Sequence, residues 1–455
     1  MDKHSHWMEL VSEVFDTNPR NGNRSETVWL PRPDLEGQLE SELFTRGRHI
    51  CVDGCSGSGK SSLVITTLLK RNIPYTTVQI TRKMDWHGLC KQLIQKPTRS
   101  EREAKAGASA EWKGLFPTGK LEFSLGRKVD EKITHEYWEQ VVTSASEHDI
   151  ARAIADQNCV VLIDEFERAQ PDLANSISEV CKILTQTYPS QMGKIVVLGA
   201  DDVFKKLYDA YSTLDNRLVH LSIPTLPGPQ ASWKYLKLGF RKLGKFHPGN
   251  SKFSKPGDEK KAIEAIYLAA DGLFKSLTEL GMEICRSAGE HTQGVSLATI
   301  QKTCAAIEER NFGKYRTRFA DMHRLGQSNP VTVAVLLRMN QLGLGKIHDR
   351  QEIEEALGEY GRGLVDDAIL ALWKEDFLVM TGESNQKLFI KNPSWAHTFR
   401  VYLSDPRKRK KLEAHLQKPI QFTLEIGVDW QNLETDGDTE DQDLIDKVLQ
   451  RPSLL

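Results

Sequence analysis

The residues with the clearest chemistry form one glycine-rich stretch near the start of the chain. Gly54-Cys55-Ser56-Gly57-Ser58-Gly59-Lys60-Ser61 matches the pattern G-x-x-x-x-G-K-[ST]. Glycines at these positions let consecutive backbone N–H groups turn toward a polyphosphate. Lys60 is then placed to reach the β- and γ-phosphates, and the Ser61 hydroxyl, followed by Ser62, to meet Mg²⁺. The stretch predicts a P-loop that binds ATP and Mg²⁺; an ordinary Gly/Ser turn is the alternative.

The segments on either side favour the P-loop. His49-Ile50-Cys51-Val52 has the composition of a short buried strand, and residues 62–69 have the apolar face of a helix. Strand, loop and helix in this order are the context that the motif requires. Upstream, residues 28–34 lead into a helix over 35–43, and this lead-in is placed to border the adenine.

A second pair of chemical groups follows an apolar run over 159–163. The run shows no alternation, as expected of a central parallel strand that is buried on both faces, and it ends in Asp164 and Glu165. Ligands of open α/β sheets bind at the carboxyl ends of the strands, so both carboxylates are predicted at the phosphate site. Asp164 fits the role of holding Mg²⁺, and Glu165 that of the base that positions water. The alternative is an acidic helix N-cap.

Two further strands are predicted over 194–198 and 218–223, besides one over 75–80. Helical segments separate the strands, and one of them is predicted over 134–155, so the pattern implies a parallel sheet covered on both faces. Asp201 follows one strand and is expected near the γ-phosphate. Arg217 precedes another, and two interpretations stay open: a surface arginine, or a catalytic finger acting in its own or a neighbouring subunit.

These residues resemble those of AAA+ ATPases, in the branch that includes origin-recognition-like and STAND-like proteins and the ATPases of transposition and phage-defence systems. The resemblance rests on the P-loop, Ile163-Asp164-Glu165, Gly199-Ala200-Asp201 and Arg217, and it extends over residues 26–322. It implies an α/β fold with a five-stranded parallel sheet and a helical lid. It also implies sensor 1 at Asp201 and an arginine finger at Arg217.

The segment 262–275 is similar to the lid helix that ends in the G-x-x-R sensor 2 of the family. Lys275 stands where the arginine would, and it keeps the positive charge without the planar fork. The predicted organisation is an N-terminal segment over 1–25, a nucleotide-binding core over 26–228 with an insertion over 96–132, and a lid over 229–322. A hairpin is predicted near the end of the insertion.

Residues 328–403 predict a separate winged-helix domain, with three helices followed by a hairpin. The second helix is predicted over 349–357 with a capping box, Asp349 at the N-cap and Glu352 three residues on. The third, over 362–376, carries two bases and four acids, a net charge of −2, which would repel phosphates. Protein contact is therefore favoured over reading of the DNA major groove, and the wing lysines Lys387 and Lys391 leave DNA possible.

Composition excludes several classes of protein. The 455 residues carry a formal net charge of −1, so attraction to nucleic acid or a membrane has to be local. No apolar run is long enough to span a bilayer and the chain begins with no signal peptide, so a cytoplasmic location is expected. The seven cysteines form no C-x-x-C pair, and reduced, buried thiols are expected.

The tail over 404–455 combines a basic run, 407–411, with an acidic run, 434–443, and is a candidate docking segment.

The sequence supports two functional hypotheses. The first is an ATP-hydrolysing AAA+ switch that couples nucleotide state to homo-oligomerisation and to a partner protein or nucleic-acid machine, which the resemblance places in mobile-element or antiphage systems. The second is a nucleotide-gated scaffold or DNA-binding adaptor with little turnover. A P-loop small-molecule kinase is a third and weaker alternative, because a lid and winged helix have no use there.

Overall fold

The computed structural model describes residues 3–16, 28–95, 116–117, 135–200, 203–210, 217–226, 228–244, 257–270, 272–289, 295–342, 348–381, 386–404 and 410. The chain divides into two compact units. One comprises Arg32–Ile223 and contains the P-loop, and the other comprises Met1–Pro31 with Pro224–Leu455. Within the described ranges no helix is both long and apolar enough to cross a membrane.

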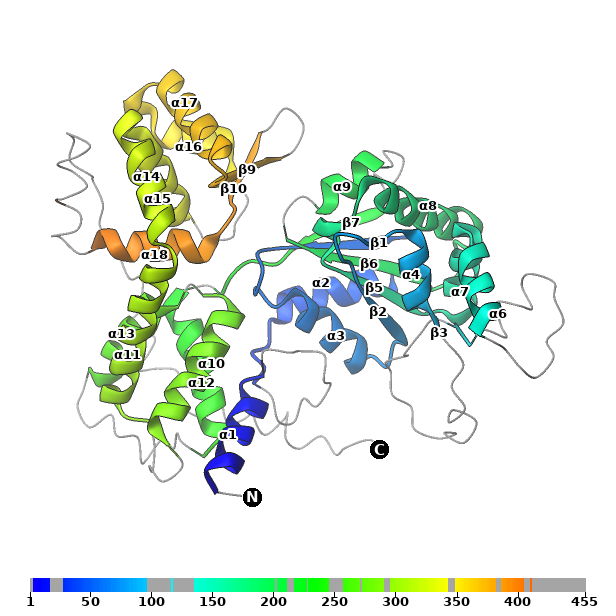
Figure 1. The fold of residues 1–455 in the computed structure, drawn as a ribbon, viewed down its shortest axis with the longest axis horizontal. Helices are drawn as coiled ribbons and strands as arrows, with labels where there is room; N and C mark the ends of the chain where they lie inside the picture. The colour runs from blue at the N-terminus through cyan, green and yellow to red at the C-terminus, as the bar shows by residue number, and fades with distance from the viewer. Residues whose placement is uncertain are drawn as a thin grey trace. The chain divides into compact units, whose positions relative to one another are not determined.

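The P-loop unit is built on a five-stranded sheet in the order β2-β5-β6-β1-β7, with every pair parallel (Figure 1). The strands are β1 (His49–Asp53), β2 (Tyr75–Gln79), β5 (Val160–Asp164), β6 (Lys194–Gly199) and β7 (Leu218–Ser222). The central strands β1 and β6 are buried at every residue. Because all strands run the same way, the residues after β1, β5 and β6 meet at one edge.

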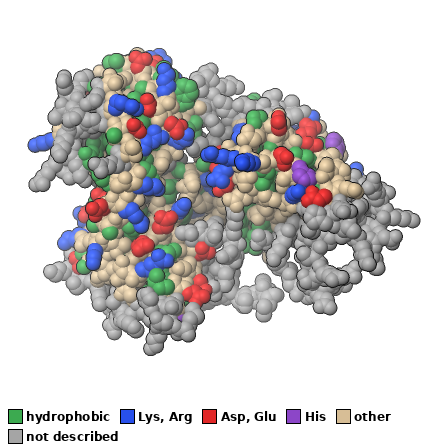
Figure 2. Space-filling view, viewed as in Figure 1, with side chains coloured by type: hydrophobic (Ala, Val, Ile, Leu, Met, Phe, Trp, Pro, Cys, Tyr) green, Lys and Arg blue, Asp and Glu red, His purple; other side chains and the backbone are tan. Residues whose placement is uncertain are grey.

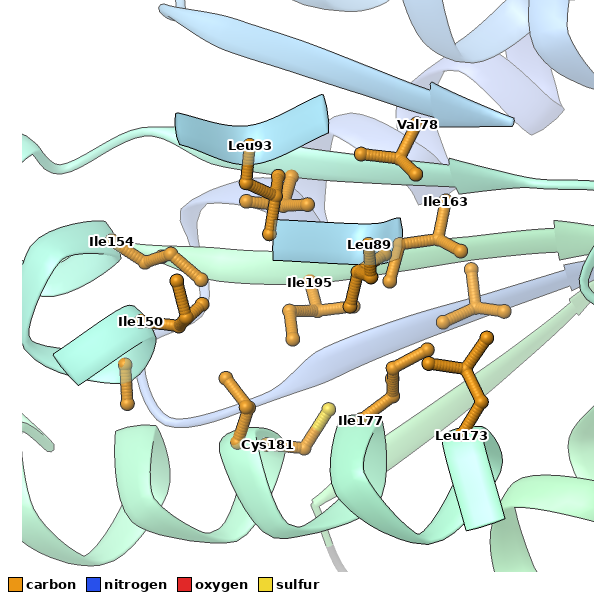
Figure 3. Close-up of a cluster of buried hydrophobic side chains, with 14 of the residues drawn as sticks. Val78, Leu89, Leu93, Ile150, Ile154, Ile163, Leu173, Ile177, Cys181 and Ile195 are labelled. Atoms are coloured by element: carbon orange, nitrogen blue, oxygen red, sulfur yellow. The ribbon is translucent and has the colours of Figure 1, made fainter. Parts of the chain in front are cut away.

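Helices cover both faces of this sheet. They are α2 (Pro33–Phe44), α3 (Lys60–Lys70), α4 (Trp86–Leu93), α6 (His135–Ser144), α7 (Glu147–Gln157), α8 (Pro171–Thr187) and α9 (Val203–Ala210), with the 3-10 turn η2 (Phe166–Arg168). Alternate strand residues such as Ile163 and Ile195 pack on side chains of α4, α7 and α8, including Leu89, Ile154 and Ile177 (Figure 3). Burial of these apolar side chains holds the helices against the sheet, and the positions of the strand ends are fixed as a result.

One detail of this unit differs from the sequence prediction, and another is not tested. The single helix expected over 134–155 is two helices, because Ser146 and Asp149 form a capping box that starts α7. The predicted insertion contains only β4 (Phe116–Pro117), paired in parallel with β3 (Ile94–Gln95), among described residues. The hairpin predicted near its end lies outside the described residues.

The second unit is mostly helical over its described residues. Its helices are α1 (Lys3–Val14), α10 (Gly228–Lys242), α11 (Asp258–Ala269), α12 (Phe274–Ala288), α13 (Leu297–Lys314), α14 (Arg316–Ser328), α15 (Val331–Leu342), α16 (Arg350–Ala356), α17 (Arg362–Lys374) and α18 (Pro393–Ser404), with the 3-10 turn η4 (Gly358–Tyr360). Phe15, just after α1, lies against α10 and α12, where a Cβ on Gly239 or Gly281 would come within 2.2 Å of its ring. Only glycines leave room for this ring, so the start of the chain packs into a notch between two lid helices.

The segment predicted as a winged helix contains α15, α16 and α17 and a three-stranded antiparallel sheet. Its strands are β8 (His348–Asp349), β9 (Leu378–Thr381) and β10 (Lys387–Ile390), in the order β8-β10-β9. The predicted capping box at α16 is wrong. Asp349 is the N-cap but caps no backbone N–H, and its carboxylate instead accepts a hydrogen bond from Lys387 at 2.6 Å.

Candidate nucleotide site

The P-loop follows β1 and turns sharply into α3. Gly54, Gly57 and Gly59 have positive φ angles of 146°, 86° and 87°, which side chains disfavour. A Cβ on Gly54 would also lie 2.5 Å from the carbonyl oxygen of Ile223. The glycine pattern therefore meets a real backbone requirement, and the loop delivers the amino end of α3, with its free N–H groups, to the sheet edge.

Lys60 is folded back over this loop. It is 8% exposed, and its Nζ donates to the carbonyl oxygens of Gly54 at 2.6 Å and Cys55 at 3.0 Å. The ammonium is thus held by two loop carbonyls, next to the backbone N–H groups of the same loop. Cys55 and Ser58 are buried, Gly57, Gly59, Ser61 and Ser62 are half-buried, and Ser56 is exposed.

Ser61 and Asp164 come together across the edge of the sheet. The Ser61 hydroxyl donates to Asp164 Oδ2 at 2.8 Å, from the first turn of α3 to the last residue of β5. A hydroxyl and a carboxylate are the hard oxygen ligands that Mg²⁺ prefers beside phosphates. The two residues therefore fit a Mg²⁺ site, in which the ion would neutralise phosphate charge.

Glu165, next to Asp164, adopts a conformation that is uncommon for a residue with a side chain. Its φ is 59°, and its N–H donates to Asp164 Oδ1 at 2.9 Å. Its carboxylate pairs with Arg168 Nη1 at 2.6 Å. Backbone strain of this kind is kept where the surroundings demand it and clusters at functional sites. The turn brings Glu165 to the same edge as the P-loop.

The end of β6 is tied to the same turn through Glu167. Its Oε2 accepts the N–H of Ala200 at 3.1 Å, and its carbonyl accepts from Lys206 at 3.0 Å. Asp201, the predicted sensor 1, lies outside the described residues. The contacts of its neighbours show only that the chain reaches this edge at Ala200.

Arg217 lies at the amino ends of the parallel strands, opposite the carboxyl ends where the P-loop lies. Its carbonyl oxygen accepts the N–H of His49, the first residue of β1, at 2.8 Å. It thus stands before β7, whose five residues span about 17 Å between the sheet edges. Arg217 and the P-loop of the same chain are at opposite ends of parallel strands. Lys275, the second predicted cation, is exposed near the start of α12 in the other unit.

Two residues at the site had not been singled out from the sequence. Arg32, in the lead-in to α2, donates from Nη2 to the carbonyl of Ser58 within the P-loop at 3.1 Å. Burial lowers its pKa to about 10, against the opposing effect of Glu36. The signal was the pattern Pro31-Arg32-Pro33 directly before a helix, because a residue that precedes proline has a restricted, extended backbone.

The other residue is Asp53, the last of β1. It is 5% exposed, and its Oδ2 accepts from His220 Nε2 of β7 at 2.5 Å. No motif in the sequence points to a role for His220. Because the pair joins two neighbouring strands immediately before Gly54, it supports the start of the P-loop, a relation that sequence spacing cannot reveal.

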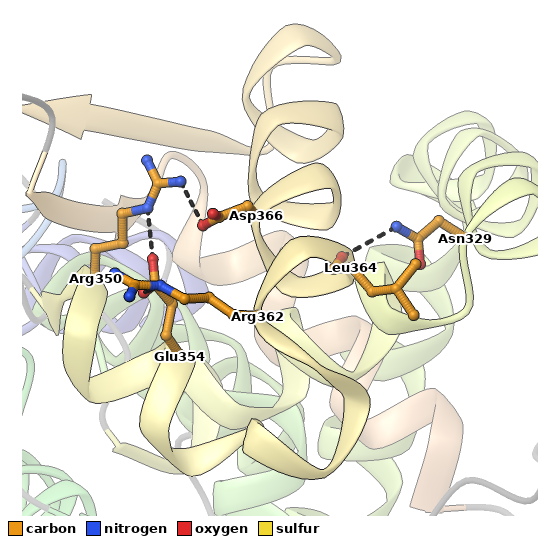
Figure 4. Close-up of polar contacts among 6 residues, drawn as sticks. All are labelled: Asn329, Arg350, Glu354, Arg362, Leu364 and Asp366. Carbon is orange, nitrogen blue, oxygen red and sulfur yellow. Dashed lines mark hydrogen bonds and ion pairs between the residues drawn. The ribbon is translucent and has the colours of Figure 1, made fainter.

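Several charged residues of the predicted winged helix form ion pairs with one another. Arg350 contacts Glu354 at 2.8 Å and Asp366 at 2.5 Å, and Arg362 contacts Glu354 at 3.1 Å (Figure 4). The two wing lysines are likewise engaged, Lys387 with Asp349 at 2.6 Å and Lys391 with Asp376 at 2.5 Å. Acidic and basic side chains are also interspersed over the described residues on the face in Figure 2. Paired cations are poor phosphate ligands.

The third helix of that domain also exposes apolar side chains. Leu364, Leu370 and Trp373 of α17 are 53%, 36% and 46% exposed, and the other large exposed hydrophobic among the described residues is Phe44. All seven cysteines are buried and none forms a disulfide, as expected of reduced thiols. In the tail, Lys410 of the basic run is described and exposed, whereas the acidic run lies outside the described residues.

Residues 44–207 match the protein family described as AAA domain. Together with the parallel sheet and the P-loop, this match defines a P-loop AAA+ fold, as the sequence predicted. No curated protein matches the sequence.

Solved structures similar to this chain include the Walker-type ATPase PABY2304 of Pyrococcus abyssi, with 18% identity, a TM-score of 0.47, and coverage of 85% of this chain and 99% of that one. The ORC2 protein of Aeropyrum pernix, in ADPNP–ADP complexes, is 13% identical, with a TM-score of 0.43 and coverage of 89% of this chain and 97% of that one. The RuvB Holliday junction branch migration motor of Thermotoga maritima is 10% identical, with a TM-score of 0.39 and coverage of 88% of this chain and 99% of that one. These likenesses are too distant to carry an activity, so the functional argument rests on the site itself.

Proposed function

We propose that this protein binds Mg²⁺–ATP at residues 54–62 and hydrolyses it to ADP and phosphate. The observation that carries the proposal is the hydrogen bond from Ser61 to Asp164, beside Lys60 and Glu165 at one sheet edge. The chemistry of phosphoryl transfer is mainly positioning and charge neutralisation, and these four side chains are of the types that it requires. A small-molecule kinase is a weaker proposal, because a helical lid and a winged helix have no use in such an enzyme.

Each residue has a defined part in this proposal. The N–H groups of the loop and the amino end of α3 bind the phosphates, and Lys60 exchanges its carbonyl partners for phosphate oxygens. Ser61 and Asp164 hold Mg²⁺. Glu165 orients the attacking water, and Asp201 and Lys275 sense the γ-phosphate.

Arg217 acts on a neighbouring subunit in this proposal. Its position at the opposite edge from its own P-loop supports action in trans, since the side chain of an arginine cannot span the sheet. Hydrolysis would then require a homo-oligomer, which couples ATP turnover to assembly.

The C-terminal winged helix serves partner binding. The paired cations and the exposed Leu364, Leu370 and Trp373 support contact with an effector protein more than contact with DNA. The partner protein or nucleic-acid machine, in a mobile-element or antiphage system, is proposed from the family resemblance alone. The cytoplasmic location is proposed from the sequence.

A second candidate is a nucleotide-gated scaffold with little turnover. One observation favours it: the Glu165 carboxylate is already held by Arg168 at 2.6 Å. A carboxylate engaged in an ion pair is less available to orient water, so release of this pair would be the controlled step.

The test is ATP hydrolysis by the wild type and Glu165→Gln at several protein concentrations, with and without double-stranded DNA. Glu179→Gln, at another ion-paired and partly exposed glutamate of the same unit, is the matched control. A rate per subunit that rises with concentration and disappears in Glu165→Gln alone supports the assembling ATPase. ATP binding without turnover under every condition supports the scaffold. Absence of ATP binding refutes both.

A further inference from the structure

The P-loop is held at both points where the chain passes between the two units. The passages lie at Pro31–Arg32 and Ile223–Pro224. At the second, the N–H of Ile223 donates to the carbonyl of Asp53 at 2.8 Å, and its own carbonyl lies over Gly54. At the first, the guanidinium of Arg32 donates to the carbonyl of Ser58. The start and the middle of the loop are thus each fixed from a different passage.

Arg32 is an unusual group to find at such a place. Its side chain is half-buried, and its backbone N–H donates to Glu36 Oε1 at 3.0 Å. Burying a cation is costly unless polar groups replace the lost water. A charge-assisted bond to a loop carbonyl recovers part of that cost and is stronger than a neutral one.

The acceptor of this hydrogen bond is the carbonyl oxygen of Ser58, in the middle of the P-loop. Ser58 is 1% exposed, and it lies between Gly57 and Gly59, whose φ values of 86° and 87° leave the local backbone few other restraints. The orientation of the peptide plane at the Ser58 carbonyl determines where the next N–H, that of Gly59, points. A donor on this carbonyl therefore aims an N–H group of the phosphate cradle.

We propose that Arg32 is a positioning residue of the phosphate site, which holds the Ser58–Gly59 peptide in the orientation that binds polyphosphate. The proposal rests on the proposed function, because it assigns Arg32 a part in the same site. Arg32 acts through the loop backbone, and it need not touch the nucleotide. Its positive charge additionally favours the negative ligand over a neutral one.

The experiment compares Arg32→Met and Arg32→Lys with the wild type, in two measurements. The first is amide hydrogen exchange without nucleotide, read for peptides covering residues 54–60 and, as an internal reference, β5 and β6. The second is the affinity for a fluorescent ATP analogue. Arg48→Met is the matched control. Arg48 lies in the same unit, just before β1 and so at the opposite end of that strand from the loop. Its side chain is 46% exposed and pairs with Glu42 at 3.6 Å.

We expect Arg32→Met to speed amide exchange in the loop about tenfold and to leave exchange in β5 and β6 unchanged. It should also weaken binding of the ATP analogue about tenfold. Both changes correspond to the loss of one hydrogen bond to a charged group. Arg32→Lys, which keeps the charge but not the reach of the fork, should lie between. Unchanged loop exchange and affinity in Arg32→Met would overturn the proposal. Faster exchange throughout the unit would also overturn it, since Arg32 would then be a general packing residue.

The failures of the two proposals are distinguishable. If the wild type binds no nucleotide, the proposed function is wrong, and the phosphate part of the role of Arg32 falls with it. Loosening of residues 54–60 alone in Arg32→Met would then show that Arg32 restrains the loop backbone and nothing more. If the wild type binds the analogue and Arg32→Met binds it equally well with an unchanged loop, the proposed function stands and the positioning role is wrong.

Discussion

Glu165 and Arg168 form an ion pair of 2.6 Å on the turn after β5, so the residue proposed to orient water is held by a neighbour three positions along the chain. The arginine is 46% exposed, and such a pair contributes at most about 1 kcal/mol. The pair is therefore weak enough to be exchanged during a catalytic cycle, and it does not by itself exclude turnover.

Replacing Arg168 with alanine should raise ATP turnover about two- to fivefold, because the freed Glu165 carboxylate no longer has to break a pair worth roughly 0.5–1 kcal/mol. Steady-state kcat, measured at saturating ATP, checks this. Lys182→Ala, which removes an equivalent pair with Glu179 on α8, should leave kcat unchanged. A fall in kcat of Arg168→Ala would instead show that the arginine assists the reaction.

Ser61→Ala and Asp164→Asn should each weaken the Mg²⁺-dependent part of ATP binding about tenfold or more, since each removes a ligand of the proposed ion. The measurement is titration of a fluorescent ATP analogue with Mg²⁺ and with EDTA. In EDTA the variants should bind like the wild type. Thr66→Ala, on the same helix as Ser61, is the control substitution. Equal losses with and without Mg²⁺ would contradict a metal role.

His49 makes the stability of the P-loop unit depend on pH. Its Nδ1 accepts from the N–H of Ile195 at 3.1 Å and its Nε2–H donates to the carbonyl of Cys181 at 2.9 Å, so the ring is neutral in the folded protein. Burial lowers the pKa of His49 from 6.5 to about 4. Between these values the unfolded chain binds the proton and the folded one does not. The contribution of His49 to stability is therefore constant above pH 6.5 and is lost as pH falls toward 4.

The expected loss from His49 is about 3 kcal/mol over that window. Urea unfolding of the wild type and His49→Gln from pH 7.5 to 4.5 measures it. The variant should start less stable, because it loses buried hydrogen bonds, but its stability should fall less steeply with pH. His87→Gln, at a histidine that is 36% exposed, should follow the wild-type pH dependence. Parallel curves for the wild type and His49→Gln would refute the assignment.

Phe15→Ala should destabilise the second unit by about 3–5 kcal/mol, because the ring fills the notch that Gly239 and Gly281 leave open. Guanidinium unfolding followed by circular dichroism gives the change. Leu10→Ala, at a half-buried position of α1, should cost less. A loss below about 1 kcal/mol for Phe15→Ala would mean that the start of the chain adds little to the lid core.

The sequence by itself determined the elements whose signals are local. The spacing of Gly54, Gly59, Lys60 and Ser61 is set by backbone geometry that only glycine permits, so the P-loop was predictable with its strand and helix. The unbroken apolar run before Asp164 likewise predicted a central strand and the edge at which its carboxylate would lie. Helix boundaries were less certain, as the capping box at Ser146 shows, because a cap competes locally with continued helix.

Only the tertiary structure decided which residues from distant segments meet. Asp53 pairs with His220 across 167 positions, and Arg32 meets the Ser58 carbonyl across 26, and neither separation has a period that sequence reasoning could detect. Strand order also places Arg217 at the opposite edge from its own P-loop, which the linear order of residues leaves open. The physical reason is that sheet pairing and burial are global: the register of β7 against β1 sets these neighbours, and it is the sum of contacts along both strands.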